Sequence, residues 1–265
     1  MEIGELEIGG LLELCKDLAI QAGKAIMDVY DSEGGFEIEY KADASPLTKA
    51  DRVSHCIIVD ALKEKYPRFA ILSEEEKDNK TRLDNDYCFI IDPLDGTKEF
   101  IKRNGEFTVN IALAYKHKSV LGVIYVPVTG ELYYAAAGRG GWLKEENGTV
   151  KKLQVSDITE HDKVRLVMSS SHPCKEMEEL IEKNNFTNFV KMGSSLKGCL
   201  IAKGDAEIYY RHNPTMEWDT AAMQCIVEEA GAVFRQMDDS EMLYNRENPL
   251  NANGFYIINH IKNKL

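Results

Sequence analysis

The sequence has no apolar run long enough to span a membrane, and its first residues lack the basic and apolar segments of a signal peptide. We therefore expect a cytoplasmic protein, with peripheral attachment to the inner membrane as the alternative. Its six cysteines lie far apart without a C-x-x-C pair, which argues against a zinc site or a disulfide framework. The cysteines in apolar stretches, which we expect to be reduced and buried in the core, are Cys56, Cys88, Cys199 and Cys225.

Positive charge is also scarce, since 44 acidic residues outnumber 32 basic ones and leave a formal net charge of −12. This balance argues against broad binding to nucleic acid polymers and to anionic membranes. It fits a protein that holds several divalent cations. Internal repeats, low-complexity segments and long linkers are absent, and 265 residues are enough for one large domain or two closely packed ones.

Residues 1–155 predict an α+β domain. Apolar residues recur at helical spacing over residues 11–30, and a second helix is expected over residues 50–66, where Pro67 ends it. Strands are predicted at residues 36–40, 69–72, 108–115, 120–126, 132–136 and 141–143. The later strands are joined by polar or glycine-rich turns, so we expect an antiparallel sheet with the early helices on one face.

Residues 156–265 predict an α/β domain, because strands and helices alternate along this half. The strands are predicted at residues 164–168, 189–192, 206–210 and 255–259, and the helices at residues 175–183, 194–203 and 218–230. The two domains should share an interface, and ligands prefer such clefts.

The most informative stretch is residues 87–100, where an apolar, strand-like run ends in a turn that contains Pro and Gly. Asp92 and Asp95 lie on either side of this turn, and their carboxylates with a backbone carbonyl form a hard oxygen donor set that suits Mg²⁺ or Mn²⁺. Gly96 tolerates positive φ, and Thr97 can open a short helix whose N–H groups attract an anion. The same residues also fit an ordinary Asp-Pro and Asp-Gly turn.

Three further carboxylates have ordinary explanations when each is taken alone. Asp51 and Thr48 fit a capping box at the start of a helix. Glu74 belongs to an acidic run that fits a solvated loop. Asp219 lies in the first turn of a predicted helix, where a carboxylate stabilises the helix dipole. Only the ordered set of carboxylates makes a shared function credible.

Four blocks occur in order along nearly the whole chain: Thr48-x-x-Asp51, Ser73-Glu74-Glu75, Asp92-Pro93-Leu94-Asp95-Gly96-Thr97 and Trp218-Asp219-x-Ala221-Ala222. Their combination resembles the lithium-sensitive, magnesium-dependent phosphomonoesterases of the inositol monophosphatase superfamily. The resemblance implies a layered αβαβα sandwich of the inositol monophosphatase and sugar phosphatase type, formed by an α+β first half and an α/β second half.

The resemblance also implies two or three Mg²⁺ ions in one site, with Mn²⁺ as a further possibility. The first cation would be held by Glu74, Asp92 and the carbonyl of Leu94. The second would be held by Asp92, Asp95 and Asp219, and a third would share Glu74. Bound cations would activate the attacking water and stabilise the leaving oxygen.

By the same resemblance, Asp51 and Thr97 form the catalytic pair that orients the attacking water. The N–H groups of Gly96 and Thr97 would bind the phosphate that is cleaved. Because water is the nucleophile, the resemblance predicts no covalent intermediate.

Within the superfamily, several residues of the second half resemble the bacterial 3′(2′),5′-bisphosphate nucleotidases. Ser194 and Lys197 lie where these enzymes hold the nucleotide. Arg211 stands near the point where inositol phosphatases usually carry a glutamate, and an arginine fork suits a second phosphate. Ser171 and His172 would line the adenosine side. The implied reaction is hydrolysis of the 3′-phosphate of adenosine 3′,5′-bisphosphate to AMP and phosphate, in sulfur metabolism.

These nucleotide-binding residues also have ordinary explanations. Ser194 could cap a helix, Lys197 could be a solvated charge, and His172 before Pro173 could be a loop residue. The alternative functions are an inositol or sugar phosphatase with the same metal site, and a catalytically silent nucleotide-binding or metal-binding regulator. The partner is expected to be a small molecule, and the protein a monomer or homodimer.

Overall fold

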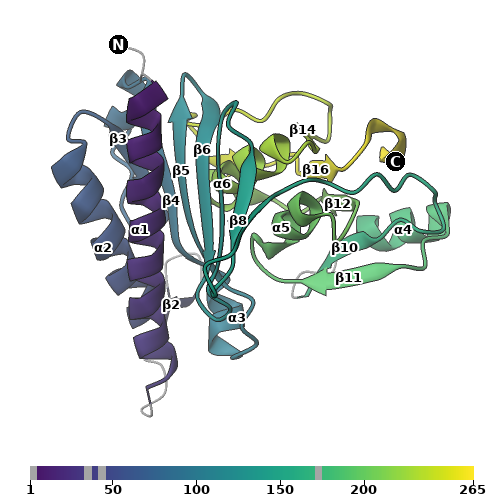
Figure 1. The fold of residues 1–265 in the computed structure, drawn as a ribbon, viewed down its shortest axis with the longest axis horizontal. Helices are drawn as coiled ribbons and strands as arrows, with labels where there is room; N and C mark the ends of the chain where they lie inside the picture. The colour runs from purple at the N-terminus through teal and green to yellow at the C-terminus, as the bar shows by residue number, and fades with distance from the viewer. Residues whose placement is uncertain (1–4, 33–37, 41–45, 171–174) are drawn as a thin grey trace.

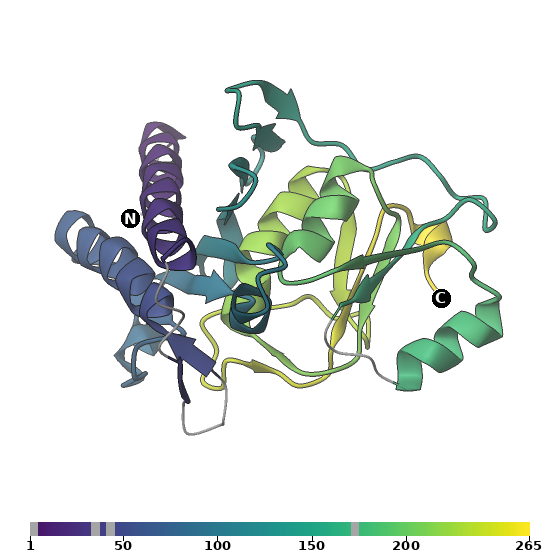
Figure 2. The same cartoon turned by 90° about the horizontal axis from the view of Figure 1, so that it is seen from below.

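The structure is a computed structural model that describes residues 5–32, 38–40, 46–170 and 175–265. Its described elements form layers in the order helix, sheet, helix, sheet, helix, as Figures 1 and 2 show from two directions. This is the αβαβα sandwich that the sequence predicts. The division into domains at residue 155 stays a prediction. One buried apolar cluster spans both halves, because it contains Ile90 and Ile124 of the first half and Ile226 and Phe234 of the second.

The first sheet has the strand order β3-β4-β5-β6-β7-β8-β9. Its strands are β3 (Ala70–Ser73), β4 (Tyr87–Asp95), β5 (Thr108–Tyr115), β6 (Lys118–Val126), β7 (Glu131–Ala136), β8 (Gly141–Lys144) and β9 (Val150–Lys152). Neighbours from β4 to β9 pair antiparallel, as predicted, whereas β3 pairs parallel with β4. The parallel pairing brings the end of β3 beside the end of β4, so Glu74 after β3 comes close to Asp92.

Two helices cover one face of this sheet: α1 (Glu5–Tyr30) and α2 (Lys49–Lys65). Leu11 and Ile26 of α1 and Ile58 of α2 are fully buried in a cluster with Phe89 of the sheet. A short antiparallel pair, β1 (Ile38–Tyr40) and β2 (Pro46–Thr48), precedes α2. The predicted capping box at the start of α2 is confirmed, and α1 begins earlier than the periodicity predicts.

The other face of the first sheet is covered by α5 (Leu196–Lys203) and α6 (Glu217–Glu229). At Gly122 of β6 the backbone of α6 comes so close that a Cβ atom would lie 2.4 Å from the carbonyl oxygen of Ala222. Only glycine permits this approach. The close packing fixes the N-terminal end of α6, and with it Asp219, against the sheet.

The second sheet has the strand order β11-β10-β12-β16-β14. Its strands are β10 (Leu166–Ser169), β11 (Phe189–Met192), β12 (Ile208–Arg211), β14 (Val233–Gln236) and β16 (Phe255–Ile258), and α4 (Lys175–Asn184) covers its outer face. The first three are parallel, and β16 runs antiparallel to β12 and β14. The remaining described elements are α3 (Thr97–Ile101), the strand pair β13 (Thr215–Met216) and β15 (Leu250–Asn251), and 3₁₀ turns at Thr81–Asp84 and Ile261–Asn263.

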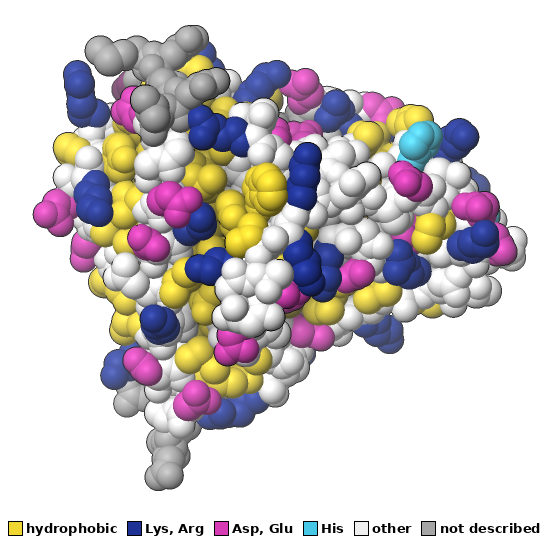
Figure 3. Space-filling model, viewed as in Figure 1, with side chains coloured by type: hydrophobic (Ala, Val, Ile, Leu, Met, Phe, Trp, Pro, Cys, Tyr) yellow, Lys and Arg dark blue, Asp and Glu magenta, His cyan; other side chains and the backbone are white. Residues whose placement is uncertain are grey.

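The cysteine prediction is correct for most of the described cysteines and wrong for one. Cys88, Cys199 and Cys225 are buried and free, and so is Cys15. Cys56 is exposed, because it lies on a face of α2 that turns away from the sheet. Among the described residues, no helix is both long and apolar enough to cross a bilayer. On the face shown in Figure 3, acidic and basic side chains are interspersed.

Candidate active site

The turn after the buried part of β4 carries the first two carboxylates. Asp92 is 1 % exposed, and its Oδ1 accepts a hydrogen bond from the N–H of Leu94 at 3.1 Å. Pairing between β4 and β5 shifts register between Asp92 and Asp95, which re-aims the second carboxylate. Gly96 follows with φ of 97°, in the left-handed region that glycine favours, and Thr97 then begins α3. The local sequence alone therefore builds this turn.

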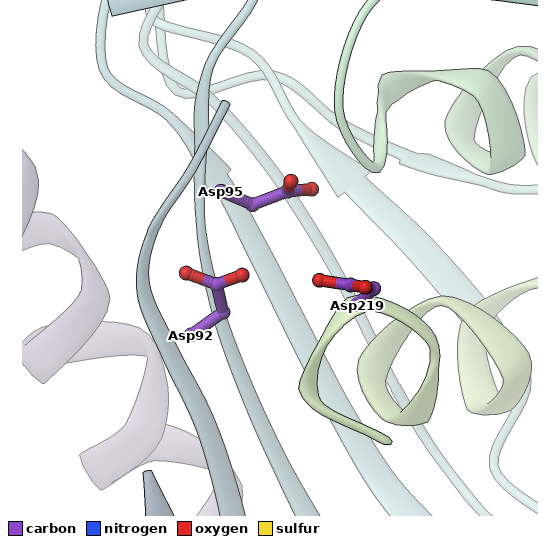
Figure 4. A group of neighbouring side chains, drawn as sticks. All are labelled: Asp92, Asp95 and Asp219. Atoms are coloured by element: carbon purple, nitrogen blue, oxygen red, sulfur yellow. The ribbon is translucent and has the colours of Figure 1, made fainter. Parts of the chain in front are cut away.

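Asp219 reaches the same point from the first turn of α6. Among the described residues, Asp92, Asp95 and Asp219 each offer a carboxylate oxygen, and these oxygens lie within 4.8 Å of one another. Figure 4 shows the three side chains converging from the strand and from the helix end. Asp219 Oδ2 also accepts the N–H of Met216 at 2.7 Å, so this residue caps α6 as well. Capping and clustering are thus compatible.

The electrostatics of this cluster favour a bound cation. Burial, together with the nearby charges of Glu74, Asp95 and Asp219, raises the pKa of Asp92 well above its ordinary value. Burial, followed by the charge of Asp95, raises the pKa of Asp219 from 3.8 to about 8. Crowded carboxylates repel one another unless protons or cations neutralise them. An all-oxygen, multiply charged donor set fits a hard divalent cation.

Glu74 and Leu94 were also predicted to hold cations. Glu74 follows β3 and lies near Asp92, because its charge and a hydrogen bond between the two side chains contribute to the raised pKa of Asp92. It lies outside the group of oxygens that are within 4.8 Å of one another. The carbonyl oxygen of Leu94 is 3.4 Å from Thr97 Oγ1, at the edge of the same turn.

The predicted water-orienting pair is close together in space. Thr97 Oγ1 lies 3.2 Å from Asp51 Oδ1. The other carboxylate oxygen of Asp51 accepts the N–H and the hydroxyl of Thr48, at 2.7 and 2.6 Å. Asp51 is therefore held by its own helix cap in a position where it can accept the proton of Thr97.

A cavity of about 260 Å³ opens beside the cluster, and predicted site residues from both halves line it. Those lining residues are Glu74, Asp95, Gly96, Thr97, Ser194, Lys197, Arg211 and Asp219. Lys197 is 7 % exposed, and its Nζ donates to the carbonyl oxygen of Ser194 at 2.6 Å. Burial lowers the pKa of Lys197 to about 8, although Asp95 acts in the opposite direction. Lys197 is thus a buried cation, and the solvated-charge alternative is wrong.

The second-phosphate candidate, Arg211, ends β12 at the rim of this cavity. Its Nε is buried without a hydrogen-bond partner among the described residues. A second cavity of about 290 Å³ adjoins the first and is lined by Ser169, Tyr209, Arg211 and His212 among others. Ser171 and His172 lie outside the described residues.

The structure corrects the prediction around Ser194. The helix does not begin there, because Ser194 has φ of 42° in the left-handed region and α5 starts at Leu196. Ser194 therefore does not cap the helix. Its hydroxyl is buried without a partner among the described side chains, in the wall of the cavity.

The predicted site residues leave out two that contact the cluster. Ser195 donates its N–H and its hydroxyl to Asp95 Oδ2 at 2.7 and 2.8 Å. Asn110 of β5 donates to the Ser195 hydroxyl at 2.9 Å. Ser195 adjoins a predicted site residue and could have been included for that reason. Asn110 lies in the middle of an apolar strand and is buried in the structure. A polar amide in such an apolar run is the signal that could have pointed to this residue, because a buried amide needs hydrogen-bond partners.

The model of the inositol monophosphatase family matches residues 11–264, and the chain belongs to this family. Enzymes of the family are metal-dependent phosphatases. Its curated relatives include the 3′(2′),5′-bisphosphate nucleotidase CysQ of Salmonella typhimurium, which is 44% identical over 93% of this chain and 99% of the relative. CysQ of Escherichia coli K12 is 43% identical over the same shares of the two chains.

Solved structures agree with this assignment. The structure of CysQ from Bacteroides thetaiotaomicron, at 40% identity, has a TM-score of 0.79 and covers 92% of this chain and 95% of its own. The extragenic suppressor protein SuhB from Bartonella henselae is 26% identical, with a TM-score of 0.80 and coverage of 96% and 95%. The fold is therefore that of the family throughout both halves.

Proposed function

We propose that this chain is a 3′(2′),5′-bisphosphate nucleotidase that hydrolyses the 3′-phosphate of adenosine 3′,5′-bisphosphate to AMP and phosphate, with a role in sulfur metabolism. The main support for this proposal is one cavity that is lined both by the carboxylates of Asp95 and Asp219 and by the cations of Lys197 and Arg211. Carboxylates suit divalent cations, and buried cations suit phosphate. The near full-length similarity to CysQ nucleotidases supports the substrate.

We assign the metal site to two Mg²⁺ ions, with a third that shares Glu74 and with Mn²⁺ as a substitute. Glu74, Asp92 and the Leu94 carbonyl would hold one ion, and Asp92, Asp95 and Asp219 the other. Divalent cations, when bound, lower the pKa of water and neutralise charge on the leaving oxygen. The crowding of Asp92, Asp95 and Asp219 supports this assignment, because cations would relieve their mutual repulsion.

Two side chains of the protein, Asp51 and Thr97, orient the attacking water and accept its hydrogen bond. Asp51 Oδ1 accepts the hydroxyl hydrogen of Thr97, so the lone pairs of Thr97 Oγ1 can accept a hydrogen bond from water in the cavity. The N–H groups of Gly96 and Thr97, at the start of α3, bind the phosphate that is cleaved. Water is the nucleophile, and no residue forms a covalent bond to phosphorus.

Substrate choice lies in the second half. The ammonium of Lys197 and the guanidinium of Arg211 face the second phosphate, and the free hydroxyl of Ser194 supplies a further donor. The adjoining cavity, with Ser169 in its wall, would take the nucleoside. Ser171 and His172, which lie outside the described residues, stay predicted contacts of the adenosine. An inositol phosphate has no group that requires this second cavity.

Phosphate release from a small substrate panel tests the proposal. Purified protein with Mg²⁺ should release phosphate fastest from adenosine 3′,5′-bisphosphate, more slowly from inositol 1-phosphate and glucose 1-phosphate, and Li⁺ should inhibit. Faster turnover of either of the last two substrates would favour an inositol or sugar phosphatase. Tight AMP binding without phosphate release from any substrate would indicate a silent regulator. The free cysteines fit a cytoplasmic enzyme, which we expect to be a monomer or homodimer.

A further inference from the structure

Ser195 contacts three other residues around the active site: Asp95, Asn110 and Asp219. Its N–H and its Oγ–H both donate to Asp95 Oδ2, at 2.7 and 2.8 Å. Its oxygen accepts the amide of Asn110 at 2.9 Å and lies 3.3 Å from the backbone carbonyl oxygen of Asp219. Ser195 is 1 % exposed, so water does not substitute for these partners. One buried hydroxyl thus contacts both a β4 carboxylate and the α6 turn that carries Asp219.

Asn110 of β5 extends this network. Asn110 is 1 % exposed, its amide lies 3.4 Å from Asp95 Oδ2, and its carbonyl oxygen accepts the hydroxyl of Thr108 at 2.9 Å. The donors from Ser195 and Asn110 all point to one oxygen of Asp95. Oδ1 is therefore the oxygen that stays available to a cation.

The same turn also holds the buried lysine. Ser194 has a left-handed backbone, and its carbonyl oxygen accepts the ammonium of Lys197 at 2.6 Å. Residues 193–197 therefore form a short connected segment with the Asp95 contact at its middle and Lys197 at its end. We therefore expect a shift of Ser195 to move Lys197 as well, because few backbone torsions separate them.

We propose that Ser195 is a positioning residue that couples cation binding at Asp95 to phosphate binding at Lys197. A cation on Asp95 fixes the carboxylate, the carboxylate fixes Ser195, and Ser195 places Lys197 for the phosphate. The effect is reciprocal, because two binding free energies that share one element must affect each other equally. The inference rests on the proposed function, since that function places the second phosphate beside Lys197.

Calorimetric titration of AMP, with Mg²⁺ and with EDTA, measures this coupling without turnover. AMP is the expected product, and its remaining phosphate belongs beside Lys197 and away from the phosphate that is cleaved. We expect Mg²⁺ to tighten AMP binding to the unaltered protein. In Ser195→Ala, the factor by which Mg²⁺ tightens binding should fall about tenfold, as expected for losing a hydrogen bond to a charged group.

Ser119→Ala is the matched control. Its hydroxyl donates to the backbone carbonyl of Ala221 in α6 at 2.7 Å and contacts none of the cluster carboxylates. This variant should keep the coupling factor of the unaltered protein. Asn110→Ala, which removes the amide that orients the Ser195 hydroxyl, should lower the factor in the same direction and gives a second test if Ser195→Ala does not fold. Thermal unfolding in EDTA reports the folding of each variant.

Two results would overturn the inference. One is an unchanged coupling factor in folded Ser195→Ala or, if that variant does not fold, in Asn110→Ala. The other is an equal loss in Ser119→Ala, which would show that loosening α6 is sufficient. If the unaltered protein binds no AMP under either condition, the proposed function itself fails and this inference fails with it. If AMP binds and the substrate panel agrees, an unchanged factor removes the coupling alone.

Discussion

The hydroxyl of Thr97 lies 3.2 Å from Asp51 Oδ1, although 46 positions separate the two residues in the chain. Asp51 belongs to the first turn of α2 and Thr97 is the first residue of α3. The second oxygen of Asp51 is occupied by Thr48, whose N–H donates at 2.7 Å. One carboxylate therefore both caps a helix and accepts the hydroxyl that we propose to be catalytic, so we expect its replacement to disturb stability and catalysis together.

Thr97→Val separates these two roles. The variant loses the hydroxyl that accepts from water and leaves the α2 cap unchanged, so kcat should fall about 100-fold or more with little change in Tm. Thr97→Ser is the control and should retain most activity, because it keeps the hydroxyl. Phosphate release and thermal unfolding provide the two measurements. A Thr97→Val enzyme with nearly unaltered kcat would contradict the relay.

The raised pKa of Asp219 leads to a prediction about how the stability of the cation-free protein depends on pH. Its pKa is about 8 in the folded chain against an ordinary 3.8, so the folded state binds more protons than the unfolded state between these values. Stability should therefore decrease as pH rises from about 4 to about 8. Thermal unfolding in EDTA at pH 5 and pH 8 measures this, and Mg²⁺ at pH 8 should raise Tm because cations replace the missing protons.

Asp219→Asn tests whether this carboxylate causes both effects. Its side-chain oxygen can still accept the Met216 N–H, so the α6 cap should survive. The variant should show a flatter pH dependence of Tm in EDTA, a smaller Mg²⁺ shift and almost no phosphatase turnover. Asp60→Asn, at an exposed position of α2, is the matched control. Normal turnover in Asp219→Asn would refute the two-metal assignment.

The lowered pKa of Lys197 leads to a prediction about how KM for the substrate changes at alkaline pH. Burial lowers the pKa of Lys197 to about 8, so its ammonium loses a proton as pH rises through this value. A neutral amine holds a phosphate more weakly, and KM for the bisphosphate should therefore increase above pH 8. Lys197→Arg should flatten this rise, because a guanidinium stays charged. Identical KM profiles for the two enzymes would show that another group controls the rise.

The role proposed for Arg211 leads to a prediction about the preference for a bisphosphate over a monophosphate substrate. Arg211→Gln should lower kcat/KM about 100-fold for adenosine 3′,5′-bisphosphate and only a few-fold for adenosine 3′-monophosphate, since the latter lacks the phosphate that we assign to the guanidinium. Arg235→Gln is a suitable control because Arg235 bonds to Glu228 away from the cavity. Equal losses on both substrates would exclude Arg211 as the reader of the second phosphate.

Much of the fold could be predicted because the local signals are strong. The bounds of β5 and β11 agree with the prediction, and α6 starts one residue earlier than predicted at Glu217. The start of α5 was misplaced because Ser194 adopts a left-handed backbone that serine rarely takes, and no local pattern reveals it. Strand β14 was missed because its residues are only partly apolar and pair with β16 across the chain.

The sequence by itself determined the local chemistry of the turn at residues 92–97: Asp92 accepts the Leu94 N–H, and Gly96 supplies the positive φ that begins α3. It also determined that Asp219 caps a helix, since capping needs only neighbouring residues. Tertiary structure alone decided that α6 comes close enough over Gly122 to bring Asp219 to the turn. It alone placed Ser195 against Asp95, because both contacts depend on packing between segments about a hundred residues apart.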